Sequence, residues 1–288
     1  MTFTNFLPAI CALSLLFATA ASAADDEDAE TDAAADQEHP LRLPSRIDED
    51  PTRDFALTSN EPIYFVVGGN DDSTGKFQFS FQYRIFDGDS GFVDEWPWLD
   101  AMHFAYTQTS VWDLLGDSSP FKDTTYRPSL FWQKIGRSDT YAPDFLRLGY
   151  EHESNGEDLE DSRSIDSLFF FPGWLFDVNE RQLLVGAKFR LPLTTSEYNE
   201  DITDYRGYVD LYARYGREDS WVSTAALRYG EARQGSLELT FSYPLRTPIF
   251  ARTGGYFYVE IFHGHGETLI DYNRHAGTQV RVGLAIVR

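Results

Sequence analysis

One short segment of the chain holds three residue types that together can perform nucleophilic catalysis: His152, Ser154 and Asp166. His152 and Ser154 are two residues apart, so on a β-strand their side chains share a face and their Cβ atoms are neighbours. That spacing brings a general base within reach of a hydroxyl nucleophile. If residues 155–163 form the loop of a regular antiparallel hairpin, His152 lies opposite Asp166. A carboxylate in that place orients the imidazole, which is the third role in a catalytic triad.

The face on which these groups lie indicates the kind of substrate. Leu148 and Tyr150 share the parity of His152 and Ser154. Leu168 and Phe170 likewise share the parity of Asp166. A triad on an apolar face near the end of a strand favours a lipid ester as the substrate. The alternative is that His152 and Ser154 merely begin a polar loop, since such pairs are common. Three groups that meet on the apolar face of one hairpin favour catalysis.

The loop between the two strands is rich in oxygen ligands, namely Glu157, Asp158, Glu160, Asp161 and Ser162. Hard oxygen donors suit Ca²⁺, and a cation beside Ser154 could polarise an ester carbonyl or hold a water molecule there. The other interpretation is an ordinary solvated acidic loop, which charge count alone favours.

Alternation of apolar and polar residues dominates the chain after residue 60. In 76–86, five large apolar residues alternate with polar ones. Such strands of about ten residues, with aromatic residues on one face and charges on the other, are typical of an outer-membrane barrel rather than a soluble sandwich. We therefore predict an all-β fold, a transmembrane antiparallel β-barrel of about twelve strands. The strands are expected near 61–68, 76–86, 101–112, 126–134, 143–154, 164–172, 182–192, 207–216, 220–229, 235–243, 254–262 and 279–287.

The N-terminal region has a different composition. An apolar run ends in Ala21-Ser22-Ala23, with small residues where a signal peptidase requires them, so we predict a signal peptide over 1–23. An uncleaved anchor is the alternative. Residues 25–38 hold eight acidic side chains and no basic ones, which predicts a disordered acidic segment over 24–60. The barrel then occupies 61–288, with the catalytic hairpin at 143–172.

Charge and cysteine content exclude several classes of function. The formal net charge is −22, and a nucleic-acid surface needs a basic stripe, so we expect no nucleic-acid partner. The single cysteine, Cys11, lies in the predicted signal peptide, so the mature chain has no disulfide and no cysteine-bound metal. An even number of strands puts both chain ends on the periplasmic side. The long polar connections 113–125, 155–163, 193–206 and 263–278 are then extracellular.

Two further polar features lie near the ends of strands. Gln108 shares the parity of Phe104 and Tyr106, which places an amide on the lipid side. A two-fold interface that pairs Gln108 with its copy would satisfy the amide, and so would water at the membrane interface. His263 and His265 have the spacing of a metal-binding pair. We interpret them first as loop residues, and only second as a transition-metal site.

The motif around the hairpin resembles that of the outer membrane phospholipase A family, which reads His-x-Ser-Asn-Gly, five residues, then Ser-Arg-Ser-x-Asn. The chain has His152-Glu-Ser154-Asn155-Gly156 and then Ser162-Arg163-Ser164-Ile165-Asp166. Further matches, in the same order as in the family, are Tyr106-Thr-Gln108, Ser118-Ser119-Pro120-Phe121, Asp201-Ile-Thr and Gly266-Glu-Thr-Leu-Ile-Asp-Tyr-Asn273. The resemblance covers roughly residues 75–285.

The resemblance implies a twelve-stranded barrel that hydrolyses acyl esters of phospholipids, of the A1, A2 and lysophospholipase types. Carried over by position, Ser154 is the nucleophile, His152 the base and Asp166 the orienting residue. The amide of Gly156 would lie in the oxyanion hole. The chain departs from the family at Asp166, where the usual residue is Asn.

The same resemblance implies calcium dependence and activation by formation of a homodimer. The calcium ligands would be the hydroxyl of Ser162, the carbonyl of Glu157 and the carbonyl of Ser118 of the partner subunit. Two alternatives stay open. One is a non-enzymatic barrel, either a porin or a structural protein, and the other is a lipid A deacylase.

Overall fold

The computed structural model describes residues 55–70, 73–138, 140–245 and 254–288. The predicted signal peptide over 1–23, and the predicted acidic segment over 24–60 up to residue 54, lie outside these residues. The described residues hold no helix that is long and apolar enough to cross a membrane.

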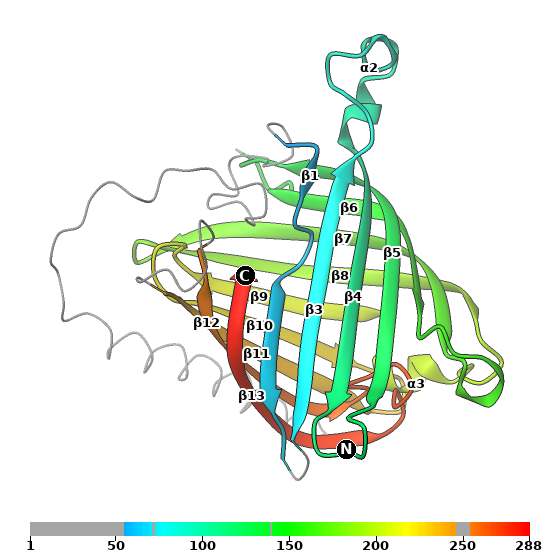
Figure 1. Ribbon diagram of the computed structural model, residues 1–288. Coiled ribbons are helices and arrows are strands. Elements are labelled where there is room, and N and C mark those ends of the chain that lie inside the picture. Colours follow the sequence, from blue (N-terminus) through cyan, green and yellow to red (C-terminus); the bar gives the residue numbers. More distant parts are fainter. Residues whose placement is uncertain (1–54, 71–72, 139, 246–253) are drawn as a thin grey trace, which may run out of the picture. The chain divides into compact units, whose positions relative to one another are not determined.

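Twelve antiparallel strands, β2 to β13, close into a barrel (Figure 1), because β3 pairs with β4 at one side and with β2 at the other. A two-residue strand, β1 (Leu57–Thr58), extends the position of β2 along β3. This confirms the predicted fold and nearly every predicted strand. The bounds are β2 (Ile63–Gly68), β3 (Thr74–Arg84), β4 (Met102–Asp113), β5 (Phe121–Ile135), β6 (Phe145–Ser154), β7 (Ser164–Val178), β8 (Arg181–Thr195), β9 (Val209–Gly216), β10 (Val222–Tyr229), β11 (Gly235–Pro244), β12 (Tyr256–His265) and β13 (His275–Val287).

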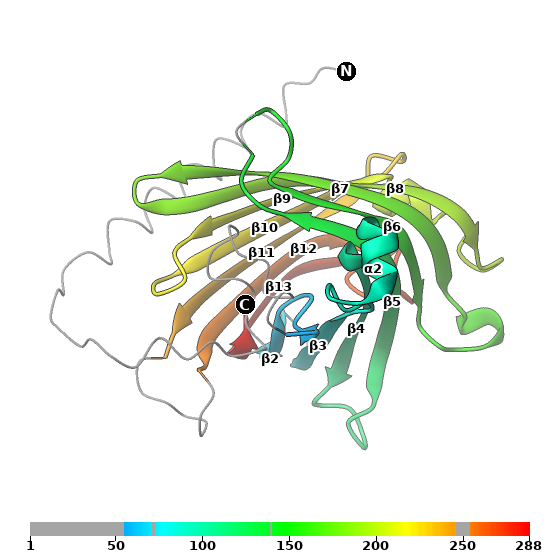
Figure 2. The ribbon, with the colours of Figure 1, turned by 90° about the horizontal axis from the view of Figure 1, so that it is seen from above.

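The alternating sequence pattern corresponds to two faces of the barrel wall. Along β3, Phe79 and Tyr83 are exposed on the outside, whereas Lys76, Ser80 and Gln82 are buried inside. The strands surround the interior of the barrel (Figure 2). Inward charged side chains form ion pairs there, such as that of Lys76 with Glu260. An apolar outer band and a polar interior are the pattern expected of an outer-membrane barrel.

The lumen contains networks of buried charges. Glu260 accepts a hydrogen bond from Lys76 at 2.8 Å and from Arg281 at 3.0 Å, and all three side chains are at most 5 % exposed. Lys188 donates to Glu151 at 2.7 Å in a second network. These ion pairs connect strands that are far apart in the sequence, and each buried charge has an opposite charge as its partner.

The connections at the two ends of the barrel differ from the simple expectation of long loops at one end only. The connection 85–101, between β3 and β4, contains helix α2 (Gly91–Glu95) and the 3-10 helix η2 (Pro97–Ala101). It extends from the end of the barrel opposite to helix α3 (Ile202–Arg206), as Figure 1 shows. This connection carries exposed aromatic residues, so the polarity that predicts the other long connections does not predict this one.

At the other end, two long connections pack against each other. Ile165, Ile202, Leu269 and Tyr272 form a buried cluster, which joins β7 with the connections 196–208 and 266–274. Asp123 fixes the second of these connections, because its carboxylate accepts hydrogen bonds from the amides of Leu269 at 2.8 Å and of Ile270 at 3.0 Å. We call this end of the barrel the capped end.

Candidate active site

The predicted hairpin is formed by β6 and β7 at the capped end of the barrel. Its register pairs His152 with Asp166 and Ser154 with Ser164, as the sequence predicts for a loop over 155–163. The His152 and Ser154 side chains share the outward face of β6, while Glu151 and Glu153 point into the lumen and are buried.

A hydrogen bond joins the imidazole to the acid. His152 Nδ1 lies 2.8 Å from Asp166 Oδ1, and the side chains are 36 % and 25 % exposed. When Nδ1 carries the proton, Nε2 is left to accept one, which is the tautomer that a general base requires. Within the described chain, this imidazole bonds to Asp166 and not to Ser154. A bond between nucleophile and base is often long before substrate binds.

Two hydroxyl groups also bind the carboxylate of Asp166. The Tyr150 hydroxyl donates to Oδ1, and Thr194 Oγ1 donates to Oδ2 at 2.6 Å. Sequence reasoning missed both roles. Thr194 lies beyond the predicted end of its strand, and it reaches Asp166 through a register irregularity between β7 and β8.

Gly156 begins the loop in a conformation that favours glycine. Its φ is +73°, and a Cβ atom there would come within 2.9 Å of Cε2 of Tyr126. Tyr126, on β5, pairs with Ser154 of β6 on one side and with Gln108 of β4 on the other. The three residues therefore form one row across the wall. Gly156 is thus two residues beyond Ser154, the last residue of β6, and it lies beside the ring of Tyr126.

The loop 155–163 is held by the side chain of Asn155, which is 3 % exposed. Its Oδ1 accepts a hydrogen bond from the amide of Arg163 at 2.9 Å, and its Nδ2 donates to the carbonyl of Asp161 at 2.8 Å. The short 3-10 helix η3 (Leu159–Asp161) follows inside the loop. The loop that carries Glu157 and Ser162 thus has a fixed backbone.

A second asparagine fixes the end of this loop from outside. Asn199, which is fully buried, accepts a hydrogen bond from the Ser164 amide at 3.1 Å and donates to the Ser164 carbonyl at 3.0 Å. Ser196 Oγ donates to the carbonyl of Ser162 at 3.3 Å. The connection 196–208 therefore clamps residues 162–164. Sequence patterns gave no signal for this, since the contact joins segments 35 residues apart.

The same connection is attached to the rest of the cap through Tyr272. Its hydroxyl donates to Asp201, and burial, together with this bond, raises the pKa of Tyr272 above its ordinary value. The Arg163 guanidinium lies 5.8 Å from the centre of the Tyr272 ring. Tyr272 stays a neutral donor over the physiological pH range and links both connections to the 155–163 loop.

The third predicted metal ligand, Ser118, lies outside the hairpin. Ser118 is in the turn between β4 and β5, with a left-handed φ of 63°. In the described ranges, no three His, Cys, Asp or Glu side chains are grouped to hold a metal. Backbone carbonyl and hydroxyl oxygens, the donor set expected at Glu157, Ser162 and Ser118, are of the kind that Ca²⁺ accepts.

His263 and His265 are explained by packing. Their rings lie 5.0 and 4.9 Å from the ring of His275, both edge to face, and His263 Nδ1 is 2.9 Å from Thr278 Oγ1. These three rings do not form a metal group in the part of the chain that the structure describes. Both histidines lie at the end of β12, so the interpretation as loop residues was wrong about their element.

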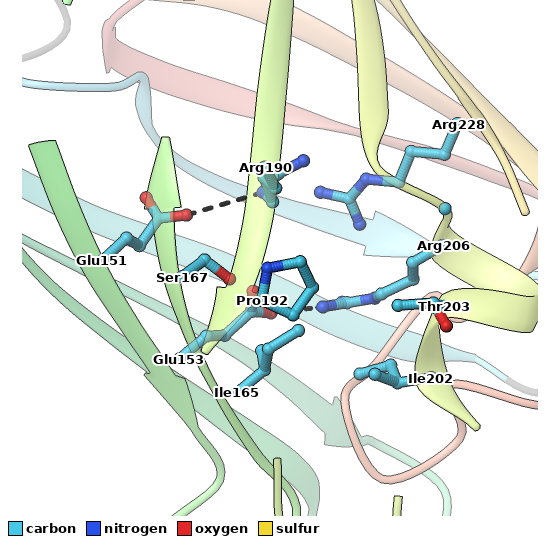
Figure 3. A pocket seen from close by; sticks show the side chains of 11 residues that line it. Glu151, Glu153, Ile165, Ser167, Arg190, Pro192, Ile202, Thr203, Arg206 and Arg228 are labelled. Carbon is cyan, nitrogen blue, oxygen red and sulfur yellow. Dashed lines mark hydrogen bonds and ion pairs between the residues drawn. The ribbon is translucent and has the colours of Figure 1, made fainter. Parts of the chain in front are cut away.

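A pocket lies on the inner side of β6, β7 and β8 (Figure 3). Several charged residues line it, and His152, Ser154 and Asp166 do not. Glu153 accepts a hydrogen bond from Arg206 at 2.8 Å, and Glu151 lies 3.8 Å from Arg190. His152 and Ser154 point to the other side of the wall. The pocket therefore belongs to the lumen network.

Fold and site together define a membrane-type antiparallel β-barrel that carries a His–Asp pair and a serine on its outer face. The model of a family described as phospholipase A1 matches residues 38–287, and the chain belongs to this family. A phospholipase A1 from Escherichia coli K12 is 32 % identical over 219 residues, which cover 74 % of this chain and 68 % of the relative. A relative from Neisseria meningitidis serogroup B is 28 % identical, and the match spans only 53 % of its length.

Solved structures agree with these relatives. The outer membrane phospholipase A from Escherichia coli superposes with a TM-score of 0.65 at 28 % identity, covering 80 % of this chain and 91 % of that one. A calcium-bound dimer of the Salmonella typhi outer membrane phospholipase has the same TM-score at 27 % identity, covering 81 % of this chain and 93 % of that one. The closed barrel and these relatives make the chain a bacterial outer membrane protein.

Proposed function

We propose that the protein is a calcium-dependent phospholipase that hydrolyses acyl ester bonds of phospholipids at the outer face of its barrel. The observation that carries the proposal is the 2.8 Å hydrogen bond between His152 and Asp166, beside Ser154, on an outward and otherwise apolar surface. A site that opens to the lipid side can reach the ester groups of a membrane lipid without extracting the lipid into water.

The geometry supports a serine hydrolase mechanism. The Ser154 hydroxyl attacks the ester carbonyl while His152 Nε2 takes its proton, and the bond to Asp166 stabilises the charged imidazole. The Gly156 amide donates to the oxyanion. The tetrahedral intermediate expels the lysophospholipid alcohol, which receives the proton from His152. Water, deprotonated by the same imidazole, then cleaves the acyl-serine and releases the fatty acid.

The residues of the loop fit calcium by the chemistry of their donors. The carbonyl of Glu157, the hydroxyl of Ser162 and the carbonyl of Ser118 of the partner subunit would hold the ion. Asn155 and Asn199 fix the backbone of the loop. When bound, Ca²⁺ supplies positive charge near the oxyanion. The calcium-bound dimer of the Salmonella typhi relative supports both the ion and a two-fold assembly.

The proposed homodimer has Gln108 at its interface. Within one barrel, the Gln108 amide already has partners, because it accepts from the Tyr106 hydroxyl at 3.0 Å and donates to Ser110 Oγ at 3.4 Å. An unsatisfied amide is therefore no longer an argument for the dimer. The support that remains is the row of Gln108, Tyr126 and Ser154, because an interface at Gln108 would lie only two strands away from Ser154.

The test is release of fatty acid from mixed phospholipid–detergent micelles by refolded protein. We expect release in excess Ca²⁺, none in EDTA, and a loss of about 10³-fold or more in the Ser154→Ala variant, whose barrel is unchanged. No release from folded, dimeric wild type would contradict the proposal. Conductance in planar bilayers would then test a porin, and acyl release from lipid A would test the deacylase.

A further inference from the structure

The carboxylate of Asp166 accepts hydrogen bonds from three side chains on two neighbouring strands. Oδ1 accepts from His152 Nδ1 at 2.8 Å and from the Tyr150 hydroxyl. Oδ2 accepts from Thr194 Oγ1 at 2.6 Å. Tyr150 and His152 are on β6, Thr194 is on β8, and Asp166 lies between them on β7. Both oxygens are therefore held, so the plane of the carboxylate is fixed relative to the imidazole.

An irregularity in the sheet brings Thr194 to this place. Along β7 and β8, Ser167 pairs with Pro192 and Leu168 with Leu191. A regular continuation of that register would put Leu193 opposite Asp166. The register shifts at this point, and Thr194 lies opposite Asp166 instead. A β-bulge re-aims a side chain in this way. Here the bulge puts the hydroxyl of Thr194 opposite Asp166 in place of the apolar side chain of Leu193.

The chemistry of the donors selects an ionised acid. A carboxylate accepts from all three donors at once, whereas with an amide one of the hydroxyl groups would have to accept a hydrogen bond instead of donating one. A charge on an outer wall beside Leu168, which is 45 % exposed there, is unfavourable unless hydrogen bonds compensate it. Hydrogen bonds to a charged group are about twice as strong as neutral ones.

We propose that Tyr150 and Thr194 are positioning residues that hold Asp166 as an ionised carboxylate in the orientation that fixes the His152 imidazole. This inference rests on the proposed function. Neither residue touches the ester, so each acts on the reaction through Asp166. Their side chains are exposed on the outside of the barrel, so we expect isosteric replacement to leave the fold intact.

The test measures Tyr150→Phe and Thr194→Val in two backgrounds, the wild type and Asp166→Asn. In the wild type we expect each variant to lower kcat about tenfold, on the scale of a charged hydrogen bond, with KM nearly unchanged. In Asp166→Asn, the same replacements change kcat by less than about threefold, because the charge that they bind is gone. Thr194→Ser keeps the hydroxyl and serves as the matched control, with near wild-type kcat.

Equal losses in both backgrounds, or no loss in the wild type, would overturn the inference. A second readout does not depend on activity. In ¹⁵N-labelled Ser154→Ala protein, we expect a low-field resonance of the His152 Nδ1 proton that moves upfield in both Tyr150→Phe and Thr194→Val. An unmoved resonance would overturn the inference even in an active enzyme. If the wild type releases no fatty acid but the resonance moves, the proposed function fails and the positioning of His152 stands.

Discussion

Neighbouring residues of β6 lie in two different environments, and their comparison separates structural charges from reactive ones. Glu151 and Glu153 point inward, are less than 10 % exposed, and pair with Lys188 at 2.7 Å and with Arg206 at 2.8 Å. The outward His152 pairs with Asp166 at a similar distance, but about a third of its side chain is exposed. Pairs of basic and acidic side chains therefore join strands on the inner face, and on the outer face a similar pair stays accessible.

The difference also bears on the alternative of a porin. The charges of the lumen bind one another across strands that are far apart in sequence, as Lys76 and Glu260 do. Side chains engaged in this way fill the interior of a small barrel instead of lining a pore. The outward pair of His152 and Asp166 joins two adjacent strands, and it leaves Nε2 of the imidazole available to accept a proton.

The largest expected effect is a loss of stability caused by a substitution on the inward face. Glu260→Gln leaves Lys76 and Arg281 without their shared carboxylate, and breaking a buried pair costs about 3–5 kcal/mol. We expect the free energy of unfolding in urea, measured on refolded protein in detergent, to fall by this amount. The activity of the protein that remains folded should stay at the wild-type level. Lost activity at unchanged stability would remove the distinction between the two faces.

A smaller effect is expected where a buried group supports the outer site. Asn199→Ala removes both hydrogen bonds to Ser164, so the end of the 155–163 loop loses its clamp. We expect the Ca²⁺ concentration for half-maximal fatty-acid release to rise about tenfold, which corresponds to about 1.4 kcal/mol. Ser196→Ala, which removes only the longer hydrogen bond to the Ser162 carbonyl, is the matched control and should shift less. An unchanged calcium requirement would show that the loop is fixed without the clamp.

The smallest effect is expected for an outward polar residue that takes no part in the reaction. Gln108→Leu removes an amide from the proposed interface, and hydrogen bonds in membranes average about 0.6 kcal/mol. We expect the dissociation constant of the dimer, from sedimentation in detergent, to rise about threefold. Thr109→Val, which alters the neighbouring residue of β4, should leave it unchanged. Identical self-association in Gln108→Leu and wild type would exclude Gln108 from the interface.

The sequence was sufficient wherever a feature depends on alternation alone. The strands, the two faces and the pairing of His152 with Asp166 all follow from a period of two and a loop over 155–163. The bulge that brings Thr194 to Asp166 was not predictable, because it breaks that period. Asn199 was missed for a related reason, since its partners are backbone groups of another connection. Helix α2 was missed because its five residues are too few to show a helical period of apolar residues.

The cap has a consequence for the order in which the barrel is assembled. Asp123 binds the amides of Leu269 and Ile270, which follow it by almost 150 residues. Tyr272 lies against Arg163 of the 155–163 loop, although more than a hundred residues separate them. Contacts between such distant segments form late, because closing a long loop is entropically unfavourable. The hairpin and its clamp by Asn199 can form before the last strands are in place. The contact with Tyr272 forms only when these strands have joined the first, so the surroundings of the loop are complete only after barrel closure.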